Sequence, residues 1–251
     1  MPELAVLKSK NGSAFSGLFD GELIAGFSDR LCGNMSLNYA DTRGSLANRK
    51  NFLQNLGLDY RSLVCAKQTH GVNIKRAGLL QKGNGALEYE AALVDTDAVI
   101  TDQKNLPIAL FTADCLSVFL YDCVKHSLGL VHAGWRGTQG NLVAKTILSM
   151  RSEFDCRPEN IHVFFGPAIR SCCYEVGKDF RDKFPKNILR RGKNFFLDLT
   201  EINRQQLGLC GIKPSNITDC SICTSCRSEE YFSFRKEGLS SGRIMSVMSL
   251  L

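Results

Sequence analysis

The chain has 251 residues, 44% of them hydrophobic, enough to bury a substantial core, and a formal net charge of +6 at pH 7. Its basic residues are spread along the chain without a long basic run, which argues against nucleic-acid binding and suits small anionic substrates. No apolar segment approaches the roughly 20 residues needed to cross a bilayer, and residues 1–10 lack the pattern of a signal peptide. We therefore expect one domain over residues 1–251, located in the cytoplasm, without a membrane or nucleic-acid partner.

The N-terminal part of the chain predicts strands and one helix. Residues Leu4 to Lys8 and Leu23 to Phe27 have the composition of short strands separated by a glycine-containing turn. A helix is expected to begin at a cap formed by Asp41 or Thr42 and to stop at Gly57. Its buried stripe is the set Leu46, Arg49, Phe52, Leu53 and Leu56.

The central part predicts closely spaced strands with no helix between most of them. These strands are Leu63–Lys67, Ala98–Thr101, Ile108–Phe111, Leu116–Tyr121 and Leu128–Val131. Residues Gly78 to Ala92 show no clear period and are expected to form a long loop. Strands in this arrangement favour a mixed or antiparallel sheet.

The C-terminal part alternates helices and strands. Helices are expected over Gly140–Phe154, Val176–Phe184 and Thr200–Leu209, and strands over Ile161–Phe165 and Ile244–Leu250. The basic segment Lys186–Lys193 is expected to be a solvated loop. The whole pattern predicts an α+β fold.

The segment from Leu128 to Gly140, LGLVHAGWRGTQG, has the composition of a functional site. His132 stands at the end of a predicted strand, and Trp135 lies between two glycines with Arg136 directly after it. A glycine-rich turn lets the backbone approach a ligand closely, and Thr138 is the expected cap of the helix that follows. Trp135 can stack on a purine or pack beneath the loop.

Two upstream segments add potential metal ligands, His70 in KQTHG and Cys115 in TADC. Together with His132 they form a His/Cys/His set, and a catalytic zinc keeps three protein ligands of these types with one open position. The spacing differs from that of a zinc finger, so we expect convergence because each residue ends a strand of one sheet. A lone histidine at a strand end is also typical of structural hydrogen bonding. Asp114 is either a partner that orients an imidazole or a turn residue.

These segments resemble the YfiH/laccase-domain family, bacterial relatives of the human laccase-domain-containing protein. The resemblance also includes DTDAVIT at 95–101, GPAI at 166–169, CYEV at 173–176, FSFR at 232–235 and Gly242-Arg243, and it runs from about Gly26 to the C-terminus. It implies a single domain with layered mixed β-sheets flanked by helices, in an α/β/β/α order. It also supports the metal ligand set His70, Cys115 and His132.

The resemblance further implies a zinc-dependent purine nucleoside phosphorylase acting on adenosine and inosine, with adenosine deaminase and methylthioadenosine phosphorylase side activities. Its partners are then purine nucleosides and phosphate, with Arg136 gripping phosphate and Arg30 matching the family's N-terminal arginine at the substrate site. Zinc is the expected metal and copper is possible, but four histidines are too few for multicopper centres. The oligomeric state stays open.

A second enzyme class remains open at this stage, because the family's fold is grouped with deamidases that use a Cys/His pair. In that hypothesis Cys115 is a thiolate nucleophile activated by His132, for example in an amidase that edits peptidoglycan precursors. A non-enzymatic metal-binding scaffold is a third alternative. Metal content and nucleoside turnover distinguish the three.

The remaining cysteines are interpreted as structural. The odd total of eleven argues for reduced thiols rather than a disulfide framework. The run Cys220, Cys223 and Cys226 resembles three ligands of a ferredoxin cluster, but the fourth cysteine with its trailing proline is missing. We expect these to be structural thiols, with accessory metal binding as the alternative. The pair Cys172-Cys173 is expected to be two small residues at a helix start.

Overall fold

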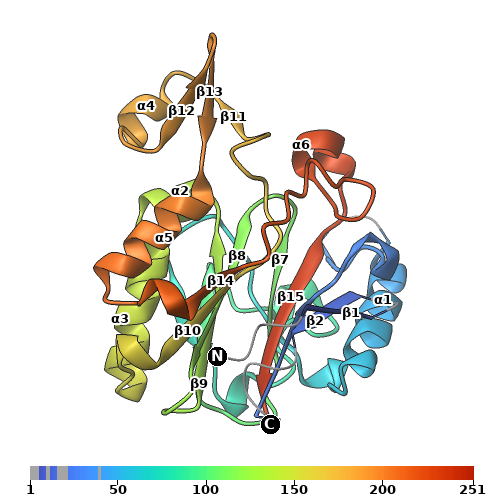
Figure 1. The fold of residues 1–251 in the computed structure, drawn as a ribbon. Coiled ribbons are helices and arrows are strands. Elements are labelled where there is room, and N and C mark those ends of the chain that lie inside the picture. Colours follow the sequence, from blue (N-terminus) through green and yellow to red (C-terminus); the bar gives the residue numbers. More distant parts are fainter. Residues whose placement is uncertain (1–5, 10–11, 16–21, 39–40) are drawn as a thin grey trace.

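Two six-stranded mixed sheets form the centre of the part of the chain that is described, residues 6–9, 12–15, 22–38 and 41–251 of the computed structural model (Figure 1). The first sheet has the order β1 (Val6–Ser9), β2 (Gly12–Phe15), β3 (Leu23–Phe27), β15 (Ile244–Leu250), β7 (Ile108–Thr112) and β4 (Val64–Cys65). The second has the order β14 (Ile217–Asp219), β10 (Ile161–Phe165), β8 (Leu116–Asp122), β9 (Ser127–Ala133), β6 (Ala98–Thr101) and β5 (Ile74–Arg76). Both contain parallel and antiparallel pairs.

Helices cover the outer faces of these sheets (Figure 1). The α-helices are α1 (Thr42–Asn55), α2 (Trp135–Gln139), α3 (Leu142–Phe154), α4 (Phe180–Lys183), α5 (Leu199–Leu209) and α6 (Phe234–Glu237). Short 3-10 helices are Arg30–Cys32, Tyr60–Ser62, Leu79–Gln81, Tyr89–Ala91, Pro158–Asn160, Pro214–Asn216 and Gly238–Ser240. Helix α1 packs on the first sheet, whereas α3 and α5 pack on the second. No helix within the described ranges is both long and apolar enough to span a bilayer.

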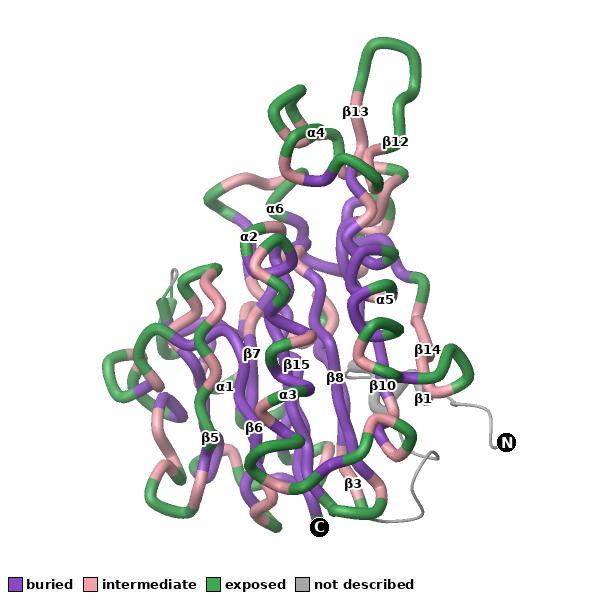
Figure 2. Tube along the Cα trace, turned by 90° about the vertical axis from the view of Figure 1, so that its left-hand side faces the viewer, coloured by how far each residue is buried: buried purple, intermediate pink, exposed green. Residues whose placement is uncertain are grey.

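Alternating side chains on the strands separate the layers. On β8, Phe119 and Tyr121 face the core between the two sheets, while Val118 and Leu120 face the core beneath α3. Both faces of the central strands are therefore buried, as the purple strands in Figure 2 show. The predicted α+β fold with layered mixed sheets is confirmed.

Helix α1 follows its sequence pattern closely. The Asp41 carboxylate accepts a hydrogen bond from the backbone N–H of Arg43 and caps the helix. The buried face includes Arg49, Phe52 and Leu53, and Gly57 beyond the last turn has a positive φ of 73°. The predicted cap and stop are confirmed, and the buried stripe is confirmed at Arg49, Phe52 and Leu53, whereas Leu46 and Leu56 are half-buried.

The structure corrects the predictions between residues 134 and 200. The predicted helix Val176–Phe184 is wrong at its start, because Glu175–Val176 forms β11 and the helix is confined to α4. The basic segment is exposed but is not a plain loop: β12 (Ile188–Arg191) pairs with β13 (Asn194–Leu197) in a hairpin that projects from the body (Figure 2). With β11 these strands form a third, three-stranded sheet within the described residues.

The junction after β9 also differs from expectation. Gly134 is the N-terminal cap of α2, so Trp135 and Arg136 lie on a short helix rather than on an open turn. Thr138 is inside α2 and accepts a hydrogen bond from Asn203 instead of capping the next helix. Helix α3 follows Asn141, whose left-handed φ of 60° turns the chain. The predicted strand at Leu4–Lys8 lies partly outside the described residues. Within them, β1 begins at Val6.

Candidate metal centre and substrate pocket

His70, Cys115 and His132 come together at one end of the paired sheets. Their potential ligand atoms all lie within 4.8 Å of one another. His132 is the penultimate residue of β9 and Cys115 directly precedes β8, and the antiparallel pairing Leu116↔Ala133 places the two side by side. His70 follows β4 of the other sheet. The predicted convergence is therefore found, but the expectation that all three end strands of one sheet is wrong.

Asp97 fixes the position of both histidines. Oδ1 of Asp97 lies 2.7 Å from Nδ1 of His132 and accepts the backbone N–H of His70 at 3.0 Å. Its Oδ2 accepts the backbone N–H groups of Thr69 and Gly71 at 3.1 and 2.7 Å. Because the carboxylate accepts a hydrogen bond from Nδ1–H, Nε2 is the nitrogen of His132 that is left to bind a metal in exchange for its proton. The pairing of β6 with β9 brings Asp97 opposite His132.

The charged forms of Asp97, His132 and Cys115 stabilise one another in this buried site. Burial opposes ionisation of the Asp97 carboxyl, yet hydrogen bonds from His132, Gly71 and Thr69 lower its pKa to about 2. Burial likewise opposes charge on Cys115 and His132, but their attraction lowers the pKa of the Cys115 thiol to about 6 and raises the pKa of His132 to about 9. Cys115 is thus poised as a thiolate, the form that ligates metal or attacks an electrophile.

The space between the three side chains is kept open by Gly134. A Cβ atom at this position would lie 3.1 Å from Sγ of Cys115 and 3.2 Å from Cδ2 of His70. The rings of His70 and His132 meet edge to face, with centroids 4.7 Å apart. A borderline donor set of two imidazoles and one thiolate with an oriented histidine fits a single zinc ion.

A pocket of about 470 Å³ opens over these three residues. Aromatic side chains in its lining include Phe111, Trp135, Tyr174 and Phe234. Arg136, Arg235 and Arg243 add positive charge. This volume and mixture of aromatic and cationic groups are suited to a small anionic or aromatic ligand.

Of the three arginines that line the pocket, Arg136 is the one without a hydrogen bond from its side chain, whereas Arg235 and Arg243 donate to carbonyl oxygens. It is exposed on α2 and its guanidinium lies 4.4 Å from the Trp135 ring centroid. Across the described ranges its guanidinium makes no hydrogen bond or ion pair with another side chain or a carbonyl group. Trp135 itself packs on Phe180, with ring centroids 5.1 Å apart. The indole therefore both packs under α4 and lines the pocket.

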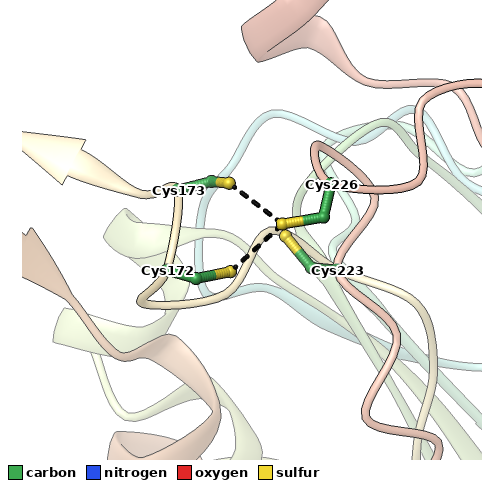
Figure 3. Close-up of side chains that lie close together, drawn as sticks. All are labelled: Cys172, Cys173, Cys223 and Cys226. Carbon is green, nitrogen blue, oxygen red and sulfur yellow. Dashed lines mark hydrogen bonds between the residues drawn. The ribbon is translucent and has the colours of Figure 1, made fainter.

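The cysteine run of residues 220–226 divides in the folded chain. The Cys220 thiol lies beside the guanidinium of Arg170. Cys223 and Cys226 instead meet Cys172 and Cys173, as Figure 3 shows. The expectation that the vicinal pair begins a helix is wrong, because both residues lie in a turn before β11.

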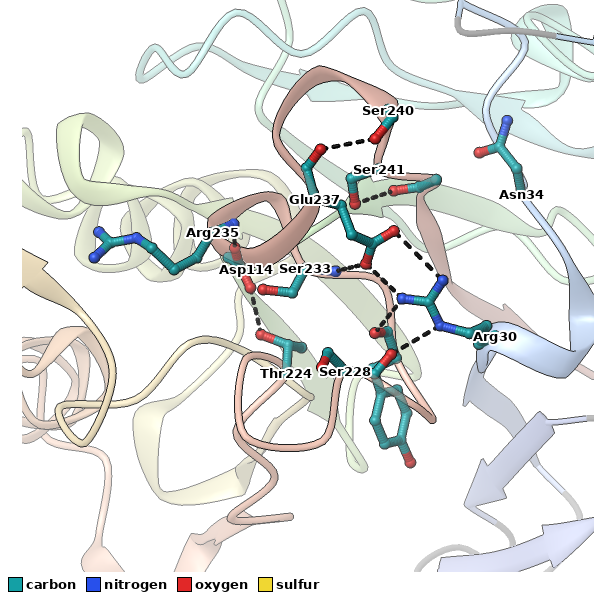
Figure 4. A network of polar contacts seen from close by, with 12 residues as sticks. Arg30, Asn34, Asp114, Thr224, Ser228, Ser233, Arg235, Glu237, Ser240 and Ser241 are labelled. Atoms are coloured by element: carbon teal, nitrogen blue, oxygen red, sulfur yellow. Dashed lines mark hydrogen bonds and ion pairs between the residues drawn. The ribbon is translucent and has the colours of Figure 1, made fainter.

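Asp114 does not orient an imidazole. Its carboxylate accepts hydrogen bonds from the Thr224 hydroxyl and from the backbone N–H of Arg235, both at 2.6 Å (Figure 4). With a φ of 86° it is a turn residue between β7 and β8. Of the two interpretations of Asp114, the turn residue is the correct one. The carboxylate that orients an imidazole is that of Asp97.

Arg30 is placed away from the pocket lining. Its guanidinium pairs with Glu237 and donates to the carbonyl oxygens of Ser228 and Tyr231 (Figure 4). It also stacks 4.5 Å from the ring centroid of Phe232. These contacts tie the loop after β3 to the C-terminal segment. We therefore leave Arg30 out of the proposed substrate site.

Comparison with known proteins agrees with the architecture. The model of the family described as multi-copper polyphenol oxidoreductase laccase matches residues 25–251. The chain belongs to this laccase-domain family.

Two relatives and one solved structure illustrate the relationship. Purine nucleoside phosphorylase YlmD of Geobacillus stearothermophilus is 32% identical over 223 residues, 85% of this chain and 81% of the relative. Adenosine deaminase RL5 of an unknown prokaryotic organism is also 32% identical over 223 residues, 84% of this chain and 81% of that protein. The crystal structure of the hypothetical protein YfiH of Bacillus licheniformis has a TM-score of 0.91 at 31% identity and covers 98% of each chain. The family resemblance and fold inferred from the motifs are confirmed.

The copper in the family's description does not match the histidines of this laccase-domain chain. Only His70 and His132 of its four histidines enter the site. His126 contacts Tyr121 and Glu22, and His162 lies on β10. Blue-copper and trinuclear centres are ligated mainly by several histidines. The residues present therefore fit one metal ion rather than a multicopper centre.

The sequence did not reveal several residues of this laccase-domain site. Asp97 was part of a recognised motif, and its position directly before a fully buried strand was the signal for its role. Tyr174 and Arg235 also belong to recognised motifs, but only the fold brings both to the pocket wall. Phe111, at a strand end, carried no functional signal of its own.

Proposed function

We propose that this protein is a zinc-dependent purine nucleoside phosphorylase acting on adenosine and inosine, with adenosine deaminase and methylthioadenosine phosphorylase side activities. The observation that carries the proposal is the approach of His70, Cys115 and His132 to within 4.8 Å beneath the pocket. Relatives named purine nucleoside phosphorylase and adenosine deaminase support the same chemistry.

The pocket offers a place for each part of a nucleoside. Phe111, Tyr174 and Phe234 give apolar surfaces for a purine ring. Arg136 lines the same pocket, so that a purine base and a phosphate can bind there together. The volume of about 470 Å³ lies in the range that encloses small-molecule ligands.

Arg136 is proposed to hold phosphate for attack. In phosphorolysis a phosphate oxygen forms a bond to C1′ of the ribose as the C1′–N9 bond breaks and the purine leaves. The guanidinium can donate two parallel hydrogen bonds to phosphate, which both positions the nucleophile and offsets its charge. Its freedom from other polar contacts leaves these donors available.

Three side chains are proposed to hold the metal, His70, Cys115 and His132. When bound, zinc supplies an electrophile for phosphorolysis and lowers the pKa of water for deamination. Asp97 would hold the Nδ1 proton of His132, so that Nε2 is the nitrogen that loses its proton when a metal binds. The loop of Thr69 to Gly71, held by the same carboxylate, keeps His70 in place.

The test measures zinc content and phosphate-dependent turnover of adenosine and inosine in the parent and in Cys115→Ala. The change should remove one zinc equivalent per chain and abolish phosphorolysis, because two imidazoles alone hold zinc weakly. The matched control is Cys123→Ala, a half-buried thiol at the other end of β8. Unchanged zinc content in folded Cys115→Ala would contradict the proposed site.

A second candidate function is supported by the succession of contacts from Asp97 to His132 and from His132 to Cys115. A carboxylate 2.7 Å from the imidazole, with that imidazole beside a thiolate, is the arrangement of a cysteine nucleophile with its base. In that case the protein is an amidase or deamidase in which Sγ attacks an acyl carbon and His132 protonates the leaving amine. A thiolate engaged as a metal ligand is not free for this attack.

Chemical modification separates the two functions. Iodoacetamide should alkylate Cys115 rapidly only if the site carries no metal, whereas a chelator should abolish turnover only if the metal is required. Protection of Cys115 from alkylation that disappears after chelation supports the phosphorylase. Rapid alkylation without chelator, together with acyl hydrolysis that chelators do not inhibit, supports the amidase.

A further inference from the structure

Four cysteine sulfurs meet at a second place, remote in sequence from the ligands of the candidate centre (Figure 3). Cys172 and Cys173 lie in the turn before β11, and Cys223 and Cys226 lie in the loop after β14. All four sulfurs are within 4.8 Å of one another. Sγ of Cys226 is 3.5 Å from that of Cys172 and 3.3 Å from that of Cys173.

The size of the cluster fits a single metal ion. These separations are well beyond the roughly 2.05 Å of a disulfide bond. Four thiolates at about 2.3 Å around a tetrahedral zinc lie about 3.8 Å from one another. A four-iron cluster is excluded because its inorganic core would hold the sulfurs much farther apart.

The backbone on one side of the cluster is already shaped to hold sulfur. The N–H of Arg227 donates to the Cys223 carbonyl at 3.0 Å and closes the turn between Cys223 and Cys226. Cys223 also pairs with Ala168 in a β-bridge. The main-chain N–H groups of Cys226 and Arg170 donate hydrogen bonds to the Cys223 sulfur.

We propose that Cys172, Cys173, Cys223 and Cys226 bind one structural zinc ion as a tetrathiolate site. Four protein ligands complete the tetrahedral shell, so this ion has no open position for substrate. The site shares no residue with the candidate catalytic centre. The proposal replaces the interpretation of these cysteines as plain structural thiols, with Cys220 left outside.

The ion would join two segments that build the pocket wall. Tyr174 directly follows the first cysteine pair, and Arg235 lies beyond the second pair. Both line the pocket, and the Arg235 guanidinium donates to the carbonyl oxygens of Cys173 and Glu175 at 3.4 and 2.8 Å. The backbone of Arg235 is also fixed by Asp114, next to Cys115. The tetrathiolate zinc therefore braces the wall that faces the substrate.

The experiment isolates this site in the full-length His70→Ala/Cys115→Ala protein, which lacks two ligands of the candidate catalytic centre. Zinc analysis should find one equivalent per chain. After exchange with cobalt(II), the protein should show intense sulfur-to-metal charge-transfer bands and the visible d–d bands of a tetrathiolate. No bound metal, iron in place of zinc, or a spectrum with nitrogen ligands would overturn the proposal.

Variants at the exposed positions complete the test. Cys172→Ser/Cys226→Ser should lose this zinc equivalent and the cobalt bands, and its melting temperature should fall. Cys220→Ser is the matched control and should retain both. In the His70→Ala/Cys115→Ala protein, which lacks the Cys115 thiol, four thiols should become reactive only after strong chelation. If these thiols react without chelation, or are joined as disulfides in freshly purified protein, the proposal is wrong. The cobalt spectrum of the protein with all four cysteines decides the question even if the double variant fails to fold.

Discussion

Asp97 is the residue on which the geometry of the candidate centre depends most. Its side chain is fully buried, and one carboxylate oxygen is hydrogen-bonded to Nδ1 of His132. The two carboxylate oxygens also accept hydrogen bonds from the backbone N–H groups of residues 69–71. One side chain thereby holds a ligand from each sheet. A carboxylate that orients a metal-bound histidine also raises the basicity of that imidazole.

Replacing Asp97 with Asn preserves the shape but presents an amide where His132 donates its proton. We expect the affinity for zinc to fall roughly 10- to 100-fold, because the tautomer and ring orientation of His132 are no longer enforced. A competition titration with a chromophoric chelator measures the loss. The control is Asp95→Asn, on the same loop but exposed and hydrogen-bonded to Thr69 and Asn73 rather than to a ligand. Equal affinities of parent and Asp97→Asn would show that Asp97 serves the loop alone.

Replacing Arg136 tests whether this residue binds the phosphate of the proposed phosphorolysis. In Arg136→Ala the loss of a charge-assisted hydrogen bond should cost roughly 1.5–3 kcal/mol in kcat/KM for phosphate. Deamination of adenosine, which needs no phosphate, should change much less. Steady-state kinetics of both reactions and a melting curve provide the measurement, with the exposed helix neighbour Gln139→Ala as the control. Equal losses in both reactions with a lower melting temperature would assign Arg136 a purely structural role.

At the scale of one element, α1 shows how a charged residue can belong to a core. Arg49 is only 2% exposed, and its guanidinium donates to the carbonyl oxygens of Met35, Gly85 and Ala86 at 2.7–2.9 Å. It also stacks over Phe111 at 4.6 Å from the ring centroid. Through these bonds α1 holds two loops, and Phe111 lines the pocket.

Arg49→Ala should therefore destabilise the fold strongly, because three buried carbonyl groups lose their donor. We expect about 3 kcal/mol of lost unfolding free energy, which for a chain of this size lowers the melting temperature by roughly 6–12 °C. Urea denaturation and calorimetry measure the change. Lys50→Ala, exposed on the same helix, should stay within about 0.5 kcal/mol of the parent. A similar small effect for Arg49→Ala would mean that water replaces the guanidinium at no cost.

The C-terminal elements show where local pattern fails. Residues 176–184 have helical spacing, yet only four residues form α4, because the preceding residues Glu175–Val176 pair with β13. Long-range strand pairing outweighed local preference there. Leu197 of this third sheet, together with Phe184 and Leu199, forms the cluster against which Trp135 packs.

On the scale of the whole molecule, the candidate centre exists because two sheets meet. Cys115 and His132 belong to the end of the second sheet, while His70 arrives from a loop of the first. The shared core between the sheets, which includes Val64, Leu110 and Leu130, fixes their relative position. A site at such a junction gains rigidity from the packing of both layers.

The sequence alone determined the α+β class, the layered arrangement through its family resemblance, and the three potential ligands of the candidate centre. Alternating apolar residues made β3, β6, β10 and β15 visible, since strand burial is a local pattern. The caps and stripe of α1 were equally local. His70, Cys115 and His132 were found because soft ligands stood at strand ends inside specific motifs.

Only the tertiary structure decided which residues become partners. Asp97 rather than Asp114 orients His132, because strand register between β6 and β9 sets that contact and register is not written in any one segment. Likewise, Arg30 pairs with Glu237 and does not line the pocket, because the fold brings these two distant segments of the chain together. Only two cysteines of the run at 220–226 join the four-sulfur cluster, and the other two are Cys172 and Cys173, some fifty positions away in the chain, which no spacing rule within the run could show.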